Sequence, residues 1–433
     1  SGGVPRGPRI RDLPFEPYWI DGGWSSVALH FVRAKRTRMV SKERILALDG
    51  LRGLTAFLII IRHLALLYEV TLDPIVVAVL MPLRHAPIGH PLFFVLTGFG
   101  LSRSLRGREE TTRLGPFLAV KLRRLAPPYY VVLLLYLIVP SWPGPQGKHR
   151  VHLNPPDSIT VFEHAVFLHG LRTDSAFAIS PPLWSMSVTV QFLWVFPLVH
   201  FLVQHEKKWR NTIAITGAWL VLRGGFEWWL GPEALRLSAV VFTRLPLFLV
   251  GMVIAQIEPQ VSQWKMGERG WSALALAILV GALISQETTW GWPVELFYAS
   301  AYASLLIAVL ISTQVDGRLA RWCASPILIR LGTCSYALFI THDLVLSRWL
   351  GMFRSIMPHP GPLSDGLMLC SGVLVALEAG VLFYLGIERP LRTWMEDPGR
   401  FPLNFPNAGS SRRLRQVVGT TIANQLSTEA RRS

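Results

Sequence analysis

Long runs of apolar residues, separated by short polar segments, are the dominant pattern of this 433-residue chain. A helix that crosses a bilayer needs about 20 predominantly apolar residues. By that measure the pattern predicts ten membrane-spanning helices, at 46–68, 86–104, 125–140, 183–204, 211–230, 238–257, 271–286, 295–313, 327–350 and 366–387. The apolar stretch 161–171 is too short to span, so we expect it to pack as a re-entrant or interfacial turn.

The basic residues between these runs are distributed unevenly. The loops predicted on the inner side are rich in lysine and arginine, and they lie at 105–124, 205–210, 258–270 and 314–326. The short outer loops at 231–237 and 287–294 together hold one basic residue, Arg236. Cytoplasmic loops carry an excess of lysine and arginine. The sequence therefore predicts an all-α, polytopic membrane bundle with both termini in the cytoplasm.

Composition agrees with this prediction and divides the chain into three parts. Only 16% of the residues are charged, against about 25% in a typical soluble domain. We expect a basic cytoplasmic or interfacial segment at 1–44 with no signal peptide, one membrane domain at 45–395 and a polar, flexible tail at 396–433. The net charge of +16 lies in short clusters between apolar runs, so we expect no nucleic-acid partner.

Ionisable side chains inside the first predicted helix are the sharpest candidates for function, because such groups are costly in a membrane. This helix holds Asp49, Arg52 and His63. Arg52 and His63 are eleven residues apart, which places them within about 20° of one face and roughly 16 Å apart along the axis. A buried His63 can act as a general base or can simply hydrogen-bond a neighbouring helix.

Other polar residues at the predicted helices have competing interpretations. His342 lies deep in the ninth run, with Asp343 beside it. Arg62 points about 100° away from His63 and is expected to snorkel or to face a different cavity. We interpret His90, before the apolar run 91–99, as a packing residue. Lys121 and its basic neighbours are either topogenic charges or a phosphate-binding set.

Seven sequence blocks in order resemble the acyltransferase 3 family of multi-pass membrane acyltransferases, in particular its stand-alone, fungal-like members. They are Leu48-Asp-Gly-Leu-Arg-Gly-Leu54 with His63, Phe93 to Phe99, Lys121-Leu-Arg-Arg124, Leu183-Trp-Ser-Met-Ser-Val188, Arg244 to Gly251, Leu331-Gly-Thr-Cys-Ser-Tyr336 with His342, and Glu388-Arg-Pro390. The resemblance covers about residues 44–395. It implies transfer of an acyl group from acyl-CoA, with acetyl-CoA expected first, to a hydroxyl.

The resemblance also implies a role for each candidate residue. His63 would be the catalytic base, with Arg52 and Asp49 nearby in the catalytic set. Arg52, Lys121 and Arg124 would bind the donor, because arginine and lysine form charge-assisted hydrogen bonds to phosphate. The later blocks would contact the substrate through Trp184, Ser185, Tyr336 and His342. No metal is expected.

Two positions depart from the family pattern, and one of them matters: Thr97 stands where the family usually has Ser, and Thr189 replaces a carboxylate. The family commonly has Glu directly after the Trp-Ser-x-Ser-Val block, where this chain has Thr189. Either another carboxylate, such as Asp49 or Glu227, takes its place, or the reaction differs from ordinary acylation.

Three hypotheses follow for the function. The first is an O-acyltransferase of an endomembrane such as the endoplasmic reticulum, acting on a small lipophilic metabolite (a terpenoid or polyketide) or on a carbohydrate. The second is a non-acylating enzyme on the same scaffold, which cyclises or rearranges a lipophilic substrate. The third is a transporter or binding protein. Motifs of soluble enzymes such as a Walker loop or GxSxG are absent from the sequence. The acyl chain, the acceptor and the oligomeric state stay open.

Overall fold

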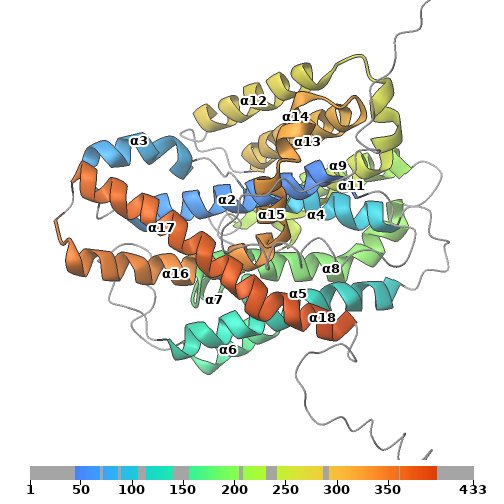
Figure 1. Cartoon of the computed structure of the whole chain (residues 1–433). Coiled ribbons are helices and arrows are strands. Elements are labelled where there is room, and N and C mark those ends of the chain that lie inside the picture. Colours follow the sequence, from blue (N-terminus) through green and yellow to red (C-terminus); the bar gives the residue numbers. More distant parts are fainter. Residues whose placement is uncertain are drawn as a thin grey trace, which may run out of the picture. The chain divides into compact units, whose positions relative to one another are not determined.

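The regular elements of the described residues are all helices (Figure 1). The computed structural model describes residues 44–68, 72–85, 89–105, 114–139, 156–203, 208–230, 241–285, 292–359 and 361–396. The chain divides into two units between Arg44 and Ile45, and the helices belong to the second. The segments predicted at 1–44 and 396–433 lie almost entirely outside the described residues.

The first half of the described chain follows the predicted runs with three differences. An additional helix precedes the second run, that run begins only at His90, and the third begins before its apolar part, with Pro127 and Pro128 inside it. The elements are α2 Leu46–Tyr68, α3 Pro74–His85, α4 His90–Leu105, α5 Leu114–Ile138, α6 Ser158–Ala165, η2 His169–Leu171, α7 Thr173–Ala176, η3 Pro181–Leu183, α8 Trp184–Val203 and α9 Lys208–Leu230.

The second half contains one interruption that the pattern of apolar residues did not predict. The run 327–350 is two helices, separated at Cys334. The last run continues through a π-helical turn, η5, into a short final helix. The elements are α11 Val241–Ile257, η4 Glu258–Gln263, α12 Glu268–Ser285, α13 Trp292–Gln314, α14 Arg318–Cys323, α15 Pro326–Thr333, α16 Ser335–Ile356, α17 Pro362–Phe383, η5 Tyr384–Glu388 and α18 Arg389–Glu396.

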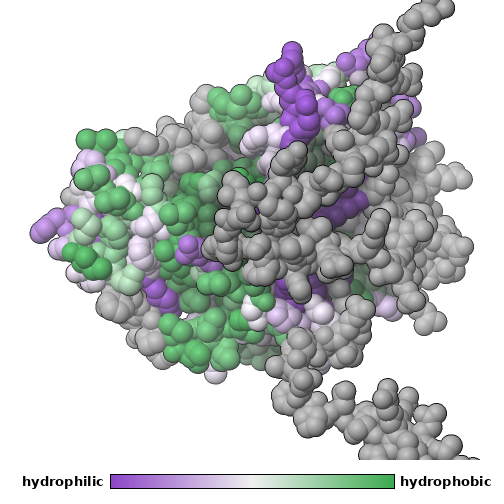
Figure 2. All heavy atoms as spheres, viewed as in Figure 1, coloured by the Kyte–Doolittle hydropathy of each residue, from purple (hydrophilic) through white to green (hydrophobic). Residues whose placement is uncertain are grey.

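Four of the described helical segments are long and apolar enough to cross a membrane by length and composition alone. They are 181–201, 242–261, 296–314 and 362–395, which correspond to four of the ten predicted spans. The surface of α17 agrees with a lipid environment, because Leu363, Leu367 and Leu374 are more than half exposed. Figure 2 shows apolar residues gathered over the part of this view that contains α3, α16 and α17.

Two buried apolar clusters organise the helices. One lies among α4, α8, α11 and α13, where the rings of Phe192 and Phe248 stack 3.9 Å apart. The other lies among α2, α5, α16 and α17. Within the first cluster α4 crosses α11 at two glycines: a Cβ at Gly98 would fall on the carbonyl oxygen of Phe248, and one at Gly251 on that of Val95. This small-residue contact lets the two backbones touch.

Candidate active site

Three histidine side chains from three helices meet in the interior of the described structure. Nδ1 of His63 on α2 and Nε2 of His342 on α16 are 2.6 Å apart, and the two rings are nearly parallel. The ring of His90, the first residue of α4, lies 5.4 Å from that of His63. The exposed fractions of His63, His90 and His342 are 7%, 6% and 0%. The two histidines that the sequence placed on separate helices therefore form one buried pair, which we call the histidine pair.

The contacts of the histidine pair assign its ring hydrogens. Nδ1 of His342 lies 3.2 Å from the carbonyl oxygen of Leu338, which can only accept, so this nitrogen carries the hydrogen. In the neutral ring Nε2 of His342 is then an acceptor, and the hydrogen of the short contact belongs to Nδ1 of His63. This tautomer leaves the lone pair of His63 on Nε2. His63 can therefore accept a proton at Nε2, while its Nδ1–H is held by the ring of His342.

The glycines of the first sequence block explain how α2 is positioned. A Cβ at Gly50 would fall on the carbonyl oxygen of Cys323, and one at Gly53 on that of Leu328. From the opposite side, a Cβ at Gly332 on α15 would fall on the carbonyl oxygen of Asp49. These glycines let α2 lie directly against α14 and α15, and α16 with His342 follows immediately. The block thus sets the place of both helices that carry the histidine pair.

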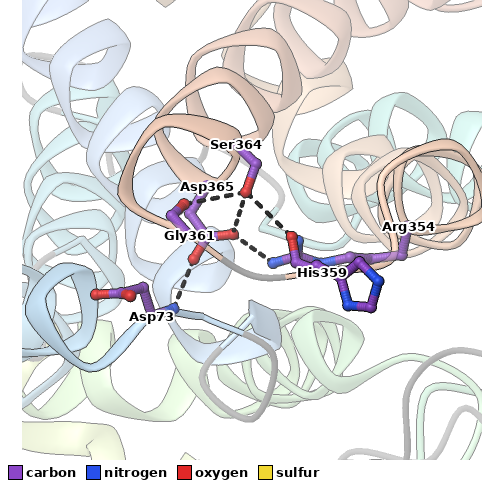
Figure 3. Close-up of polar contacts among 6 residues, drawn as sticks. All are labelled: Asp73, Arg354, His359, Gly361, Ser364 and Asp365. Atoms are coloured by element: carbon purple, nitrogen blue, oxygen red, sulfur yellow. Dashed lines mark hydrogen bonds and ion pairs between the residues drawn. The ribbon is translucent and has the colours of Figure 1, made fainter.

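The buried carboxylate of Asp365 connects the chain just beyond α2 with the last turns of α16 (Figure 3). Oδ2 of Asp365, at the start of α17, accepts from the backbone N–H of Asp73, 2.6 Å away, in the segment between α2 and α3. Its Oδ1 accepts from Arg354 on α16, also at 2.6 Å. Asp365 is fully buried and the Arg354 side chain is 10% exposed. We call these three residues the Asp365 junction, and it links the chain beyond α2 to the end of α16.

Gly89 brings His90 to the histidine pair. It has a φ of 111°, a left-handed conformation that glycine adopts without strain. A Cβ there would also fall on Cγ1 of Ile59, so the start of α4 lies against α2. Nε2 of His90 is buried and has no hydrogen-bond partner among the described residues. His90, which the sequence suggested to be a packing residue, therefore presents a polar atom within the site.

Aromatic rings and two arginines surround the histidines. The ring of Trp184, at the start of α8, lies 5.3 Å from that of His90, and the guanidinium carbon of Arg244 on α11 lies 5.4 Å from the centre of the Trp184 ring. Arg62 and Arg244 are both close enough to His90 to interact with it electrostatically. Sequence reasoning gave neither arginine a role in the site, although Arg244 opens one of the seven blocks. The signal available for Arg62 was its place beside His63.

The other residues predicted for the catalytic and donor sites lie elsewhere on their helices. Arg52 is 43% exposed and forms an ion pair with Asp49 at 3.6 Å, three turns of α2 from His63. On α5, Nζ of Lys121 lies 5.2 Å from the Phe117 ring, and Arg124 is exposed. The contacts described for these residues lie away from the histidine pair. The catalytic role of Asp49 and Arg52 and the donor-binding role of Arg52, Lys121 and Arg124 stay predictions.

Of the predicted substrate contacts, Trp184 and His342 lie at the site, whereas Ser185 and Tyr336 are directed to backbone. The Ser185 hydroxyl donates to the carbonyl oxygen of Pro182 at 3.2 Å. The Tyr336 hydroxyl donates to that of Leu125 at 2.6 Å. These bonds fix the start of α8 and the packing of α16 on α5, so both residues support the site at a distance.

Thr189 does not replace the missing carboxylate. Its hydroxyl donates to the carbonyl oxygen of Ser185, 2.8 Å away in the same helix. Of the two substitutes suggested by the sequence, Asp49 pairs with Arg52, and the side chain of Glu227 lies outside the described residues. A different carboxylate follows His342: Asp343 is buried and accepts from the hydroxyls of Tyr136 and Ser180 at 3.0 and 3.2 Å. Asp343 is thus engaged by α5 and by the segment that leads into α8.

The described part of the chain contains no group of side chains that could bind a metal ion. No three side chains of histidine, cysteine, aspartate or glutamate gather there as metal ligands, and the three histidines of the site are included in that statement. The expectation of no metal for the whole chain stays a prediction.

Apolar spans and buried polar groups between them define the class of this molecule: it is a helical integral membrane protein. The chain belongs to the acyltransferase 3 family, described as an acyltransferase domain, whose family model matches residues 45–384. This agrees with the resemblance carried by the seven sequence blocks.

Individual relatives share low identity with this chain. A Staphylococcus aureus (strain COL) protein named "Putative O-acetyltransferase" is 24% identical over 73% of this chain and 52% of its own length. "Acyltransferase MdmB" of Streptomyces mycarofaciens is 25% identical over 80% of this chain and 91% of its own. "Putative membrane-bound transacylase BcsY" of Komagataeibacter xylinus is 21% identical over 87% and 90%. The chain thus spans about half the length of the S. aureus relative. No solved structure matches the chain significantly.

Proposed function

We propose that this protein is a membrane-bound O-acyltransferase that moves an acyl group from acyl-CoA to a hydroxyl of a small lipophilic metabolite or a carbohydrate. Membership of the family and the names of the relatives support acyl transfer. The observation that carries the proposal is the 2.6 Å contact of the histidine pair, because it leaves a lone pair on Nε2 of His63 in a buried site.

In the proposed reaction Nε2 of His63 takes the proton of the acceptor hydroxyl as the oxygen attacks the thioester carbonyl carbon. A C–O bond forms, the C–S bond breaks, and the thiolate of CoA leaves. The imidazolium then returns the proton to the thiolate, so that the ester and free CoA are the products. His342 holds the orientation of His63 and shares the positive charge while it lasts. Arg52, Lys121 and Arg124 would hold the donor phosphates at the inner surface.

The proposal includes the predicted topology. Ten spans, both termini in the cytoplasm and a membrane domain at 45–395 would place the Arg52 end of α2 at the cytoplasmic side, where acyl-CoA is available. His63 would then lie roughly 16 Å deeper, within reach of a lipophilic acceptor. In a eukaryotic cell we expect the endoplasmic reticulum or another endomembrane.

One observation favours a second candidate, a cyclisation or rearrangement without acyl transfer. The Thr189 hydroxyl is bonded to its own helix and offers no carboxylate to the histidine pair. Such a reaction would use His63 for proton transfer and would consume no acyl-CoA.

The test uses the purified full chain in lipid nanodiscs with acetyl-CoA, longer acyl-CoA donors and candidate acceptors. We expect release of free CoA together with an acylated product detected by mass spectrometry. His63→Ala should reduce the rate by about 10²–10⁴-fold, the usual contribution of a general base. His359→Ala, which removes an exposed histidine, is the matched control and should leave the rate unchanged.

Two results would decide against the proposal. Full activity of the His63→Ala variant would exclude His63 as the base. A product of unchanged acyl content, formed without release of CoA, would identify the second candidate instead.

A further inference from the structure

Arg62 is a cation inside the site, and the described groups that act on it electrostatically include no carboxylate. Its Nε is buried and has no hydrogen-bond partner among the described residues. The groups that interact with the guanidinium electrostatically are the phenols of Tyr298 and Tyr302 on α13. Arg62 also interacts electrostatically with His90, whose buried Nε2 has no hydrogen-bond partner among the described residues. Arginine stays charged in proteins, so this charge is present whatever the pH.

The acidic groups near the site are engaged with other partners. Asp343 accepts hydrogen bonds from Tyr136 and Ser180 and interacts with Arg348. Asp49 pairs with Arg52 near the other end of α2. Arg244, the second arginine near His90, adds positive charge. An isolated charge inside a membrane protein is costly, and intramembrane arginines are normally paired or mark a substrate path.

We infer that Arg62 binds a carboxylate of the acceptor, so that the acceptor is a lipophilic hydroxy acid. A carboxylate is a planar monoanion that a guanidinium binds through two parallel hydrogen bonds. Although the side chains of Arg62 and His63 leave α2 about 100° apart, both approach His90: its ring lies 5.4 Å from that of His63, and Arg62 interacts with it electrostatically. The anion site and the base therefore share one neighbour. The inference rests on the proposed function for the role of the hydroxyl.

The phosphates of CoA fit this position less well. They are multiply charged and strongly hydrated, and the exposed basic residues Arg52 and Arg124 offer them sites outside the buried region. Arg62 lies roughly 15 Å further along α2 than Arg52. A single carboxylate on an apolar molecule brings one charge to one guanidinium, with apolar surface for the surrounding rings.

The probes are 12-hydroxydodecanoate and its methyl ester, which share the chain and the hydroxyl and differ in the charge. Binding to the full chain in nanodiscs is measured by the shift of the thermal unfolding midpoint with probe concentration. We expect the acid to bind about tenfold or more tightly than the ester, as hydrogen bonds to a charged group imply. Arg62→Gln should remove this preference and Arg62→Lys should retain part of it. Arg321→Gln, which removes an exposed arginine of α14, should leave it intact.

Several results would contradict carboxylate binding by Arg62. Equal binding of acid and ester by the wild type, absence of binding by both, or an unchanged preference in Arg62→Gln would overturn the inference. Stabilisation by CoA that is lost in Arg62→Gln would assign the residue to the donor instead. If Arg62→Gln does not fold, the comparison of acid and ester on the wild type still decides.

The same probes separate this inference from the proposed function. Preferential, Arg62-dependent binding of the acid without release of CoA from acyl-CoA would leave the anion site standing and would contradict acyl transfer. Equal acylation of acid and ester would support acyl transfer and contradict the anion site.

Discussion

The buried side chain of Asp365 holds two separate segments of the chain together. Its carboxylate accepts from the backbone of Asp73 and from Arg354 within a buried site. Replacement by Asn removes the charge and leaves the buried guanidinium without its counter-ion, which costs about 3–5 kcal/mol in known cases. We predict that Asp365→Asn lowers the thermal unfolding midpoint strongly and also slows acyl transfer, because the junction holds the ends of both helices that carry the histidine pair.

The control for the Asp365 junction is Ser364→Ala. The Ser364 hydroxyl contacts the carbonyl oxygens of His359 and Gly361 and, at 3.5 Å, Oδ1 of Asp365 (Figure 3). Ser364→Ala removes from the junction only this long contact of a neutral group and leaves its ion pair, so the loss should cost about 1 kcal/mol or less. An unchanged midpoint in Asp365→Asn would show that the junction does not stabilise the fold.

Single residues were predictable from sequence where their chemistry conflicted with their surroundings. His63 and His342 were candidates because ionisable groups are costly in apolar runs. Their contact was not predictable, since it joins residues 279 positions apart. His90 was interpreted as packing because it lies just before an apolar run that contains Thr97 and Gly98, which allow close helix approach. The stripe from Arg52 to His63 exists in sequence, but its two ends have different surroundings in the structure.

At the scale of elements, the connection between α5 and α8 is held by two stacked histidines outside the predicted spans. The rings of His164 on α6 and His169 on η2 stack 4.0 Å apart, and His169 bonds the carbonyl oxygen of Leu183 before α8. Burial lowers the pKa of His164 to about 3 and that of His169 to about 4. Both rings are therefore neutral in the native protein at physiological pH.

These pKa values predict an acid-sensitive connection. In the unfolded chain histidine has a pKa of about 6.5, so between that pH and the native values only the unfolded state takes up the protons. Stability is complete above about pH 6.5 and falls with acidification by about 2 kcal/mol per histidine at pH 5. We expect the unfolding midpoint in detergent to fall from pH 7 to pH 5. The double variant His164→Gln, His169→Gln should show a smaller fall, and an identical slope would refute this account.

The helices were predicted well where apolar runs are uninterrupted. They were predicted poorly where the size of the side chains at a helix contact determines where a helix ends. The run 327–350 is continuous in hydropathy, yet the helix is interrupted at Cys334, between α15 and α16. α15 lies against the glycines of α2. The early start of α5 was not predicted because Lys121, Arg123 and Arg124 interrupt the apolar run before residue 125. Lysine and arginine are good helix formers, so the helix continues through them. The stretch 161–171 contains only the end of α6, a turn and η2.

For the whole molecule, the sequence predicted a helical membrane bundle, and the described residues confirm its helical class. The number of spans stays a prediction beyond the four segments found by length and composition. The reason is physical: α2 and α16 bury charged and polar groups against other helices, so their composition resembles that of a span less than their position in the sequence suggests.

Labelling of single cysteines tests the proposed topology. In a background with Cys323, Cys334 and Cys370 replaced by serine, Lys265→Cys should be labelled only from the cytoplasmic side of sealed vesicles. Thr289→Cys, in a predicted outer loop outside the described residues, should be labelled only from the opposite side. Labelling of both positions from one side would show that the number of spans between them is even and that the proposed topology is wrong.

The short distance between the two rings of the histidine pair also sets a stoichiometry. The contact holds one hydrogen between Nδ1 of His63 and Nε2 of His342, and the neutral pair can gain one more on Nε2 of His63. A second gain would place two N–H groups of like-charged rings 2.6 Å apart, which their repulsion opposes. The neutral histidine pair can therefore take up one proton and no more. Acyl transfer from a thioester to an alcohol needs that capacity and no more, because the proton taken from oxygen goes back to sulfur. A cycle of this kind exchanges nothing with the aqueous phase, and a base enclosed by membrane helices can complete it without a proton path to water.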